Sequence, residues 1–220
     1  MLVKESDRLR NYDWVVFAQS YLYIARLACQ ELLNTETKHS KAKRMIVPYS
    51  AGDLFVPILF NVKHGIEVFI KAISLFAYGE YREGHDIHEL FVEIKQRIAK
   101  LKLTPTEQKY YDSVSKQDIE KLPADFDRIE ALVRYFYNLD LLKPLIGNDY
   151  KIRDSVNDVL RYPDSKAAVQ IDWSTILDGR VTNTAIEEIL EKTEDLSELL
   201  NKVGYIFAVL SRPASKNVSS

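Results

Sequence analysis

The chain has 220 residues, and 46% of them are hydrophobic, which is enough to fill the core of one sizeable domain. Its 30 Lys and Arg side chains are balanced by 32 Asp and Glu, so no global positive field is present to hold nucleic acid. The single cysteine, Cys29, excludes an internal disulfide and a zinc site built from several cysteines.

The N-terminal residues, MLVKESDRLR, lack the apolar stretch of a secretory signal. No run of about 18 apolar residues occurs in the chain, and a membrane-spanning helix needs a run of that length. We therefore expect a cytoplasmic protein without a membrane span.

Apolar residues recur at spacings of three and four, and glycine and proline number only seven each, which predicts a mainly helical chain. In chain order the first three predicted helices cover residues 10–33, 54–79 and 86–101, and a fourth starts near Thr104. A break at 121–127 precedes a helix over residues 126–143. The last helix begins at a capping box formed by Thr184 and Glu187. Residues 144–181 have no clear period and are predicted to be an irregular insertion. We expect one domain over residues 1–212 and a disordered tail over 213–220.

Two of the predicted helices have an apolar stripe that indicates their buried side. On the first, the stripe consists of Trp14, Phe17, Tyr21, Ile24, Ala28 and Leu32. On the second, the apolar residues fall within about 120° of the helix circumference.

The other side of the second helix carries His64, Glu67, Lys71 and Ser74. We interpret these residues as a solvent-exposed face with a Glu67–Lys71 ion pair at i,i+4 spacing, worth a few tenths of a kcal/mol. The alternative interpretation is one wall of a binding groove.

The segment GHDIHEL, residues 84–90, places His85 and His88 three positions apart beside acidic residues. Histidines at this spacing on a helix can converge on a metal ion. Asp86 followed by Glu89, directly after a glycine, is however typical of a helix start with an aspartate N-cap. Because the helix start explains more of these residues, we predict neither a metal site nor a cofactor.

Three segments in this order, HGIEVFIKAISLF, GHDIHELF and LRYPDS, resemble the HEPN superfamily over about residues 12–210. The resemblance implies an all-α, up-and-down helical bundle that often forms homodimers. It also implies an association with nucleotidyltransferases, toxin–antitoxin pairs, RNA processing or defence against invading nucleic acid. Many members of the superfamily are noncatalytic.

Catalytic HEPN ribonucleases carry an arginine, usually followed by a polar residue, and a histidine a few positions later. The segment RDSVNDVLRYP supplies Arg153 and Arg161, but Asp158 stands where the histidine would be expected, and no histidine follows in the chain. The motif is therefore broken, and we expect no ribonuclease activity by the mechanism of the superfamily. Arg82 precedes His88 by six positions, so an Arg/His pair at this other place in the sequence stays an alternative.

These observations favour a noncatalytic, dimeric HEPN-like module that binds a partner protein, a nucleotide or RNA. In the predicted groove Arg161 would contact phosphate and Tyr162 would stack on a base. The full set of groove residues is His64, Glu67, Lys71, Arg153, Arg161 and Tyr162.

Two alternatives remain open. One is a metal-independent endoribonuclease in which Arg153 or Arg161 meets His85 or His88. The other is a structural adaptor, which predicts an exposed apolar patch instead of a polar cleft.

Overall fold

The structure is a computed structural model that describes residues 5–39, 51–78, 80, 87–98, 114–137 and 181–210. These residues contain helices and no strand, which confirms the all-α prediction for this part of the chain. The helices are α1 (Glu5–His39), α2 (Ala51–Tyr78), α3 (Ile87–Ile98), α5 (Lys116–Tyr137) and α9 (Asn183–Leu210). The predicted helix start near Thr104, residues 144–180 of the predicted insertion and the tail at 213–220 lie outside the described residues.

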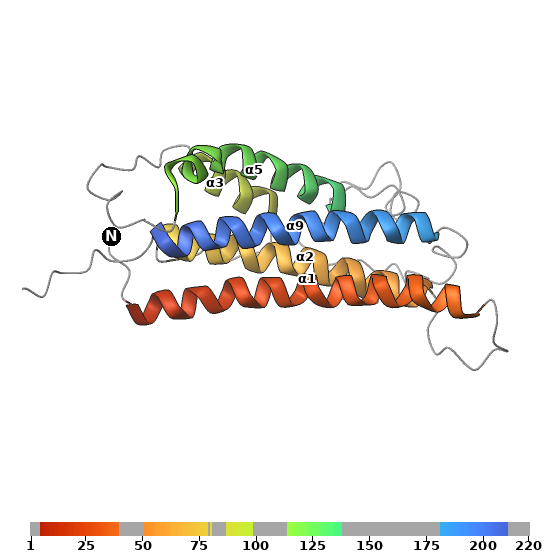
Figure 1. Cartoon of the computed structure of the whole chain (residues 1–220). Coiled ribbons are helices and arrows are strands. Elements are labelled where there is room, and N and C mark those ends of the chain that lie inside the picture. Colours follow the sequence, from red (N-terminus) through yellow and green to blue (C-terminus); the bar gives the residue numbers. More distant parts are fainter. Residues whose placement is uncertain are drawn as a thin grey trace, which may run out of the picture.

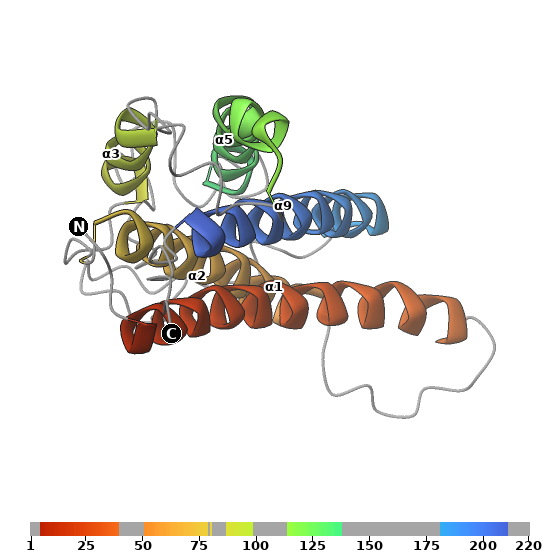
Figure 2. The same ribbon diagram turned by 60° about the vertical axis from the view of Figure 1, so that its left-hand side comes forward.

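The helices form three layers (Figures 1 and 2). α1 makes up one outer layer, α2 and α9 lie side by side in the middle, and α3 and α5 make up the other outer layer. α1 and α5 run in one direction along the bundle, and α2 and α9 run in the other. α1 packs on α2 and α9, whereas α2 contacts all four of the other helices. Buried residues from all five helices join in one apolar core.

Small residues allow α1 to approach α2 and α9 closely. A Cβ atom added to Gly65 of α2 would lie 3.0 Å from the carbonyl oxygen of Ala18, and one added to Gly204 of α9 would lie 2.9 Å from Cγ1 of Val15. The buried stripe of α1 recurs at spacings of three and four and consists of Val15, Ala18, Leu22, Ala25 and Cys29.

The N-cap of α9 lies two residues before the predicted one. The hydroxyl oxygen of Thr182 accepts a hydrogen bond from the backbone N–H of Ala185 at 3.2 Å, so Thr182 and not Thr184 is the N-cap. Val181 and Ile186 then occupy the positions of a hydrophobic staple, and both pack on the core. This apolar contact explains why the earlier threonine starts the helix.

α5 runs unbroken through the predicted break at 121–127. Ser115 and Asp118 cap its start, because Asp118 N–H donates to Ser115 Oγ at 3.1 Å and Ser115 N–H donates to Asp118 Oδ2 at 3.1 Å. Pro123 removes one backbone donor from the helix, yet Leu122 and Phe126 beside it are buried. Core packing thus outweighs the local signal from the proline.

Ion pairs connect α3, α5 and α9 around this core. Lys95 of α3 lies 2.6 Å from Asp127 Oδ1 and also donates to Glu130 of α5. Lys202 of α9 donates to Asp125 Oδ2 at 2.6 Å. None of the described helices is both long and apolar enough to cross a membrane.

Candidate functional site

The predicted binding residues His64, Glu67 and Lys71 do lie along one side of α2, but this side faces the interior. Glu67 is 2% exposed and Lys71 is 9% exposed, so the prediction of a solvent-exposed face is wrong. The reason is the central place of α2, which contacts all four of the other described helices. Val68, Ala72 and Leu75, which are apolar and lie outside the main apolar stripe, were the available signal, because they widen the apolar surface beyond the single stripe of a surface helix.

The predicted ion pair is present in this interior setting. Lys71 Nζ donates a hydrogen bond to Glu67 Oε1 at 2.8 Å, and His64 Nδ1 lies 3.8 Å from Glu67 Oε2. The imidazole of His64 also stacks on Phe60, with ring centres 5.5 Å apart, and meets the ring of Tyr21 from α1 edge-on at 4.5 Å. The histidine is thus held between two aromatic rings and a carboxylate.

Lys63 belongs to the same stripe and was not singled out from the sequence. It is fully buried, and its Nζ lies 4.5 Å from the ring centre of Tyr137 in α5, a cation–π arrangement. Lys63, Glu67 and Lys71 follow one another at i,i+4 spacing, and this spacing was the signal that could have found the first lysine.

These side chains hold α2 against its neighbours. The carboxylate and the two ammonium groups belong to residues that are at most 9% exposed, so they cannot meet the backbone of a nucleic acid unless the bundle opens. The described part of the predicted groove therefore suits a structural role better than the binding of RNA.

The other predicted site residues cannot be placed against this stripe. His88 lies in the first turn of α3, which begins at Ile87 as the helix-start interpretation of GHDIHEL predicts. The side chain of His88 lies outside the described residues, and so do His85, Arg153, Arg161 and Tyr162. Their convergence stays a prediction. Across the described ranges, no three His, Cys, Asp or Glu side chains gather as metal ligands.

Large apolar side chains gather on the side of α1 that faces away from the bundle. We call Tyr12, Val16, Phe17, Tyr23, Ile24 and Leu27 the outer face of α1; their exposed fractions run from 44% to 61%. The prediction that Phe17 and Ile24 belong to the buried stripe is wrong. α1 has apolar residues on two sides, and the side with small residues packs inward, where Gly65 and Gly204 require a close approach.

Few charges interrupt this face. Between Tyr12 and Leu27 the charged residues are Asp13 and Arg26, and Arg26 Nη2 donates to Glu194 Oε1 of α9 at 3.0 Å. Asp13 lies at the end of the face. An exposed surface that is rich in aromatic residues and poor in charge is typical of the centre of a protein–protein interface.

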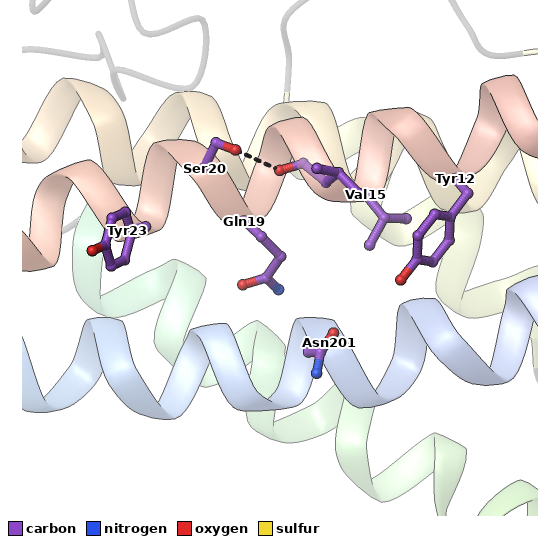
Figure 3. A pocket seen from close by; sticks show the side chains of 7 residues that line it. Tyr12, Val15, Gln19, Ser20, Tyr23 and Asn201 are labelled. Carbon is purple, nitrogen blue, oxygen red and sulfur yellow. Dashed lines mark hydrogen bonds between the residues drawn. The ribbon is translucent and has the colours of Figure 1, made fainter.

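A pocket of about 340 Å³ borders the outer face where α1 meets α9 (Figure 3). Its lining is Tyr12, Val15, Val16, Gln19, Ser20, Tyr23 and Asn201. Figure 3 shows Tyr12 and Tyr23 at its two ends, with Gln19 directed towards α9.

Two of the polar side chains that line this pocket, Gln19 and Ser20, are already engaged within the protein. Gln19 Nε2 donates to the carbonyl oxygen of Ser197 at 3.1 Å, and Ser197 Oγ donates to Gln19 Oε1 at 2.6 Å. Ser20 Oγ donates to the carbonyl oxygen of Val16 at 2.9 Å. Because no charged side chain lines the pocket, it suits an aromatic or aliphatic group better than a phosphate.

Comparison with models of protein families, with curated proteins and with solved structures finds no match to this chain.

Proposed function

We propose that the chain is a noncatalytic helical binding module of HEPN type that acts through contact with another protein. The observation that carries this proposal is the outer face of α1, which exposes six large apolar side chains on one side of one helix. Soluble proteins rarely expose contiguous apolar patches of more than a few hundred Å² unless the patch binds something. Of the hypotheses drawn from the sequence, the structural adaptor is the one that predicts such a patch, and the proposed module shares with it the contact through a protein surface.

The interior of the bundle supports the noncatalytic part of the proposal. Glu67 and Lys71 are buried and bonded to each other, so they serve packing and do not form an open groove. The sequence adds that Asp158 replaces the histidine expected after Arg153. A carboxylate there would repel an RNA phosphate rather than assist at it.

The HEPN resemblance would place this module in a toxin–antitoxin or defence setting, with a nucleotidyltransferase among the partners that it suggests. The endoribonuclease alternative requires Arg153 or Arg161 to meet His85 or His88. The nucleotide or RNA alternative requires a groove that includes Arg161 and Tyr162.

An RNA assay tests the proposal. Purified wild type, Arg153→Ala and His88→Ala are incubated with labelled RNA, with and without EDTA. We expect no cleavage by any of the three, and no increase in melting temperature when nucleotides or RNA are added. Cleavage by the wild type that either substitution abolishes would overturn the proposal. A clear rise in melting temperature with RNA would replace it with the groove alternative.

A further inference from the structure

We infer that the outer face of α1 is the contact between two copies of this chain, packed with their α1 helices antiparallel. This inference rests on the proposed function and names its partner as a second copy. It is carried by the order of the residues along α1, by the area of the face and by the pocket beside it.

The outer face is self-complementary about Ser20. Consider two identical helices packed antiparallel, with a two-fold axis at Ser20. A residue that precedes Ser20 in one copy then lies opposite a residue of the second copy that follows Ser20 by a similar number of positions. With a rotation of about 100° per residue, Val16 and Tyr23 lie on one edge of the face, and Phe17 and Ile24 lie on the other.

This arrangement pairs apolar side chains on both sides of Ser20. Val16 lies opposite Tyr23 of the second copy, and Phe17 lies opposite Ile24 of the second copy. One turn further out, Tyr12 lies opposite Leu27. Ser20, a small residue at the centre, allows the two helices to approach each other. Asp13, seven positions before Ser20, also lies opposite Leu27 of the second copy, in the outermost turn of the contact and next to the polar rim that interfaces have.

The exposed area matches that of a stable dimer. Tyr205 of α9 is 46% exposed and follows Asn201 by one helical turn, so it extends the face on the pocket side. Seven side chains about half exposed, at about 200 Å² each, amount to roughly 700 Å². Stable protein–protein interfaces bury about 800 Å² per partner.

The pocket between α1 and α9 lies on the same edge as Val16 and Tyr23. Because Val16 lies opposite Tyr23 of the second copy, that tyrosine is directed to the pocket. A tyrosine ring suits the lining, whose apolar wall is Val15 and Val16 and whose ends are tyrosines.

The test compares two identical substitutions in sedimentation experiments. Val16→Asp puts a carboxylate on the pocket edge of the face, one turn from Ser20, and Val92→Asp puts one on α3, in the opposite outer layer, where Val92 is 39% exposed. We expect wild type and Val92→Asp to sediment with twice the chain mass of 25.4 kDa. Val16→Asp should raise the dissociation constant of the dimer by about 100-fold or more, because it buries an unpaired charge.

Circular dichroism verifies that Val16→Asp still folds, and Ile24→Lys, on the other edge of the face, serves as the second variant. A wild type that stays monomeric at about 100 µM would overturn the inference, since a standard interface is saturated there. A dimer that both aspartate variants leave unchanged would overturn it as well. The RNA assay reports on the proposed function independently, because cleavage does not depend on the sedimentation result.

Discussion

Lys71 donates a hydrogen bond to Glu67 at 2.8 Å inside the helical bundle, where both side chains are almost fully buried. In water such an i,i+4 pair contributes a few tenths of a kcal/mol. In the interior the situation differs, because each charge has lost its hydration and depends on its partner. The pair therefore matters most when one of its members is removed.

The first prediction concerns this pair. Lys71→Met leaves the Glu67 carboxylate buried without its lysine, and we expect the free energy of unfolding to fall by about 3 kcal/mol or more. The double variant Glu67→Leu, Lys71→Met removes both charges and should lose less than the single variant. Urea unfolding at pH 7 measures both. A loss below about 1 kcal/mol for Lys71→Met would show that the pair behaves as a surface pair.

The second prediction concerns the contact between α1 and α9. Gly204→Ala adds a Cβ atom 2.9 Å from Val15 Cγ1, so the valine must move, and we expect a loss of about 1–3 kcal/mol. Combined with Val15→Ala, the same substitution should cost clearly less, because the opposing methyl group is gone. Urea unfolding of the two single variants and the double variant measures this coupling. Stabilisation by Gly204→Ala alone would mean that helix propensity outweighs the contact.

The third prediction concerns acid stability. Hydrogen bonds from Lys95 and then from Arg134 lower the pKa of the Glu130 carboxyl below its usual value. Because the pKa is lower in the folded state, the ionised Glu130 carboxylate contributes to the free energy of unfolding above the ordinary glutamate pKa of about 4.3. That contribution is lost as the pH falls through the lowered value. Glu130→Gln should therefore destabilise the protein at pH 7 and reduce the pH dependence of its stability in that acid range. Urea midpoints from pH 3 to pH 7 measure both effects, and parallel curves for variant and wild type would contradict the assignment.

The fourth prediction concerns Cys29. Burial in α1 raises the pKa of its thiol to about 12, so the reactive thiolate is scarce at pH 8. A thiol reagent should modify the protein only at the rate at which it unfolds, and quickly in denaturant. Rapid modification of the folded chain would show that this part of α1 opens easily.

The sequence predicted α2 well and the packing side of α1 poorly, and both results have a physical cause. A strong apolar period places α2 within a few residues, at Ala51–Tyr78 against the expected 54–79. The spacing of apolar residues along one helix does not show how many other helices pack on it, so the burial of Glu67 was not predicted. α1 has apolar residues on two sides, and either side could pack on the bundle. The side with small residues packs inward because Gly65 of α2 requires a close approach, and the sequence of α1 alone does not contain this information.

The candidate site divides in the same way. Its ion pair on α2 follows from i,i+4 spacing, whereas the outer face of α1 requires knowledge of which side packs inward. The cap at Ser115 and Asp118 was missed because Pro123 dominated the local pattern, although a serine followed three residues later by an acidic residue is a standard signal of a helix start.

Cysteine cross-linking tests the central claim, the antiparallel contact of two outer faces, most directly. In a Cys29→Ala background, Ser20→Cys places one thiol on the two-fold axis, and Gln30→Cys places one on the same helix ten residues away. Helices about 9–10 Å apart with a Cα radius of about 2.3 Å bring the two positions at Ser20 to about 5 Å, within reach of a disulfide. The positions at Gln30 would be roughly 30 Å apart. We predict rapid oxidation of the Ser20→Cys chain to a covalent dimer and little for Gln30→Cys; equal oxidation of both, or of neither, would contradict the contact.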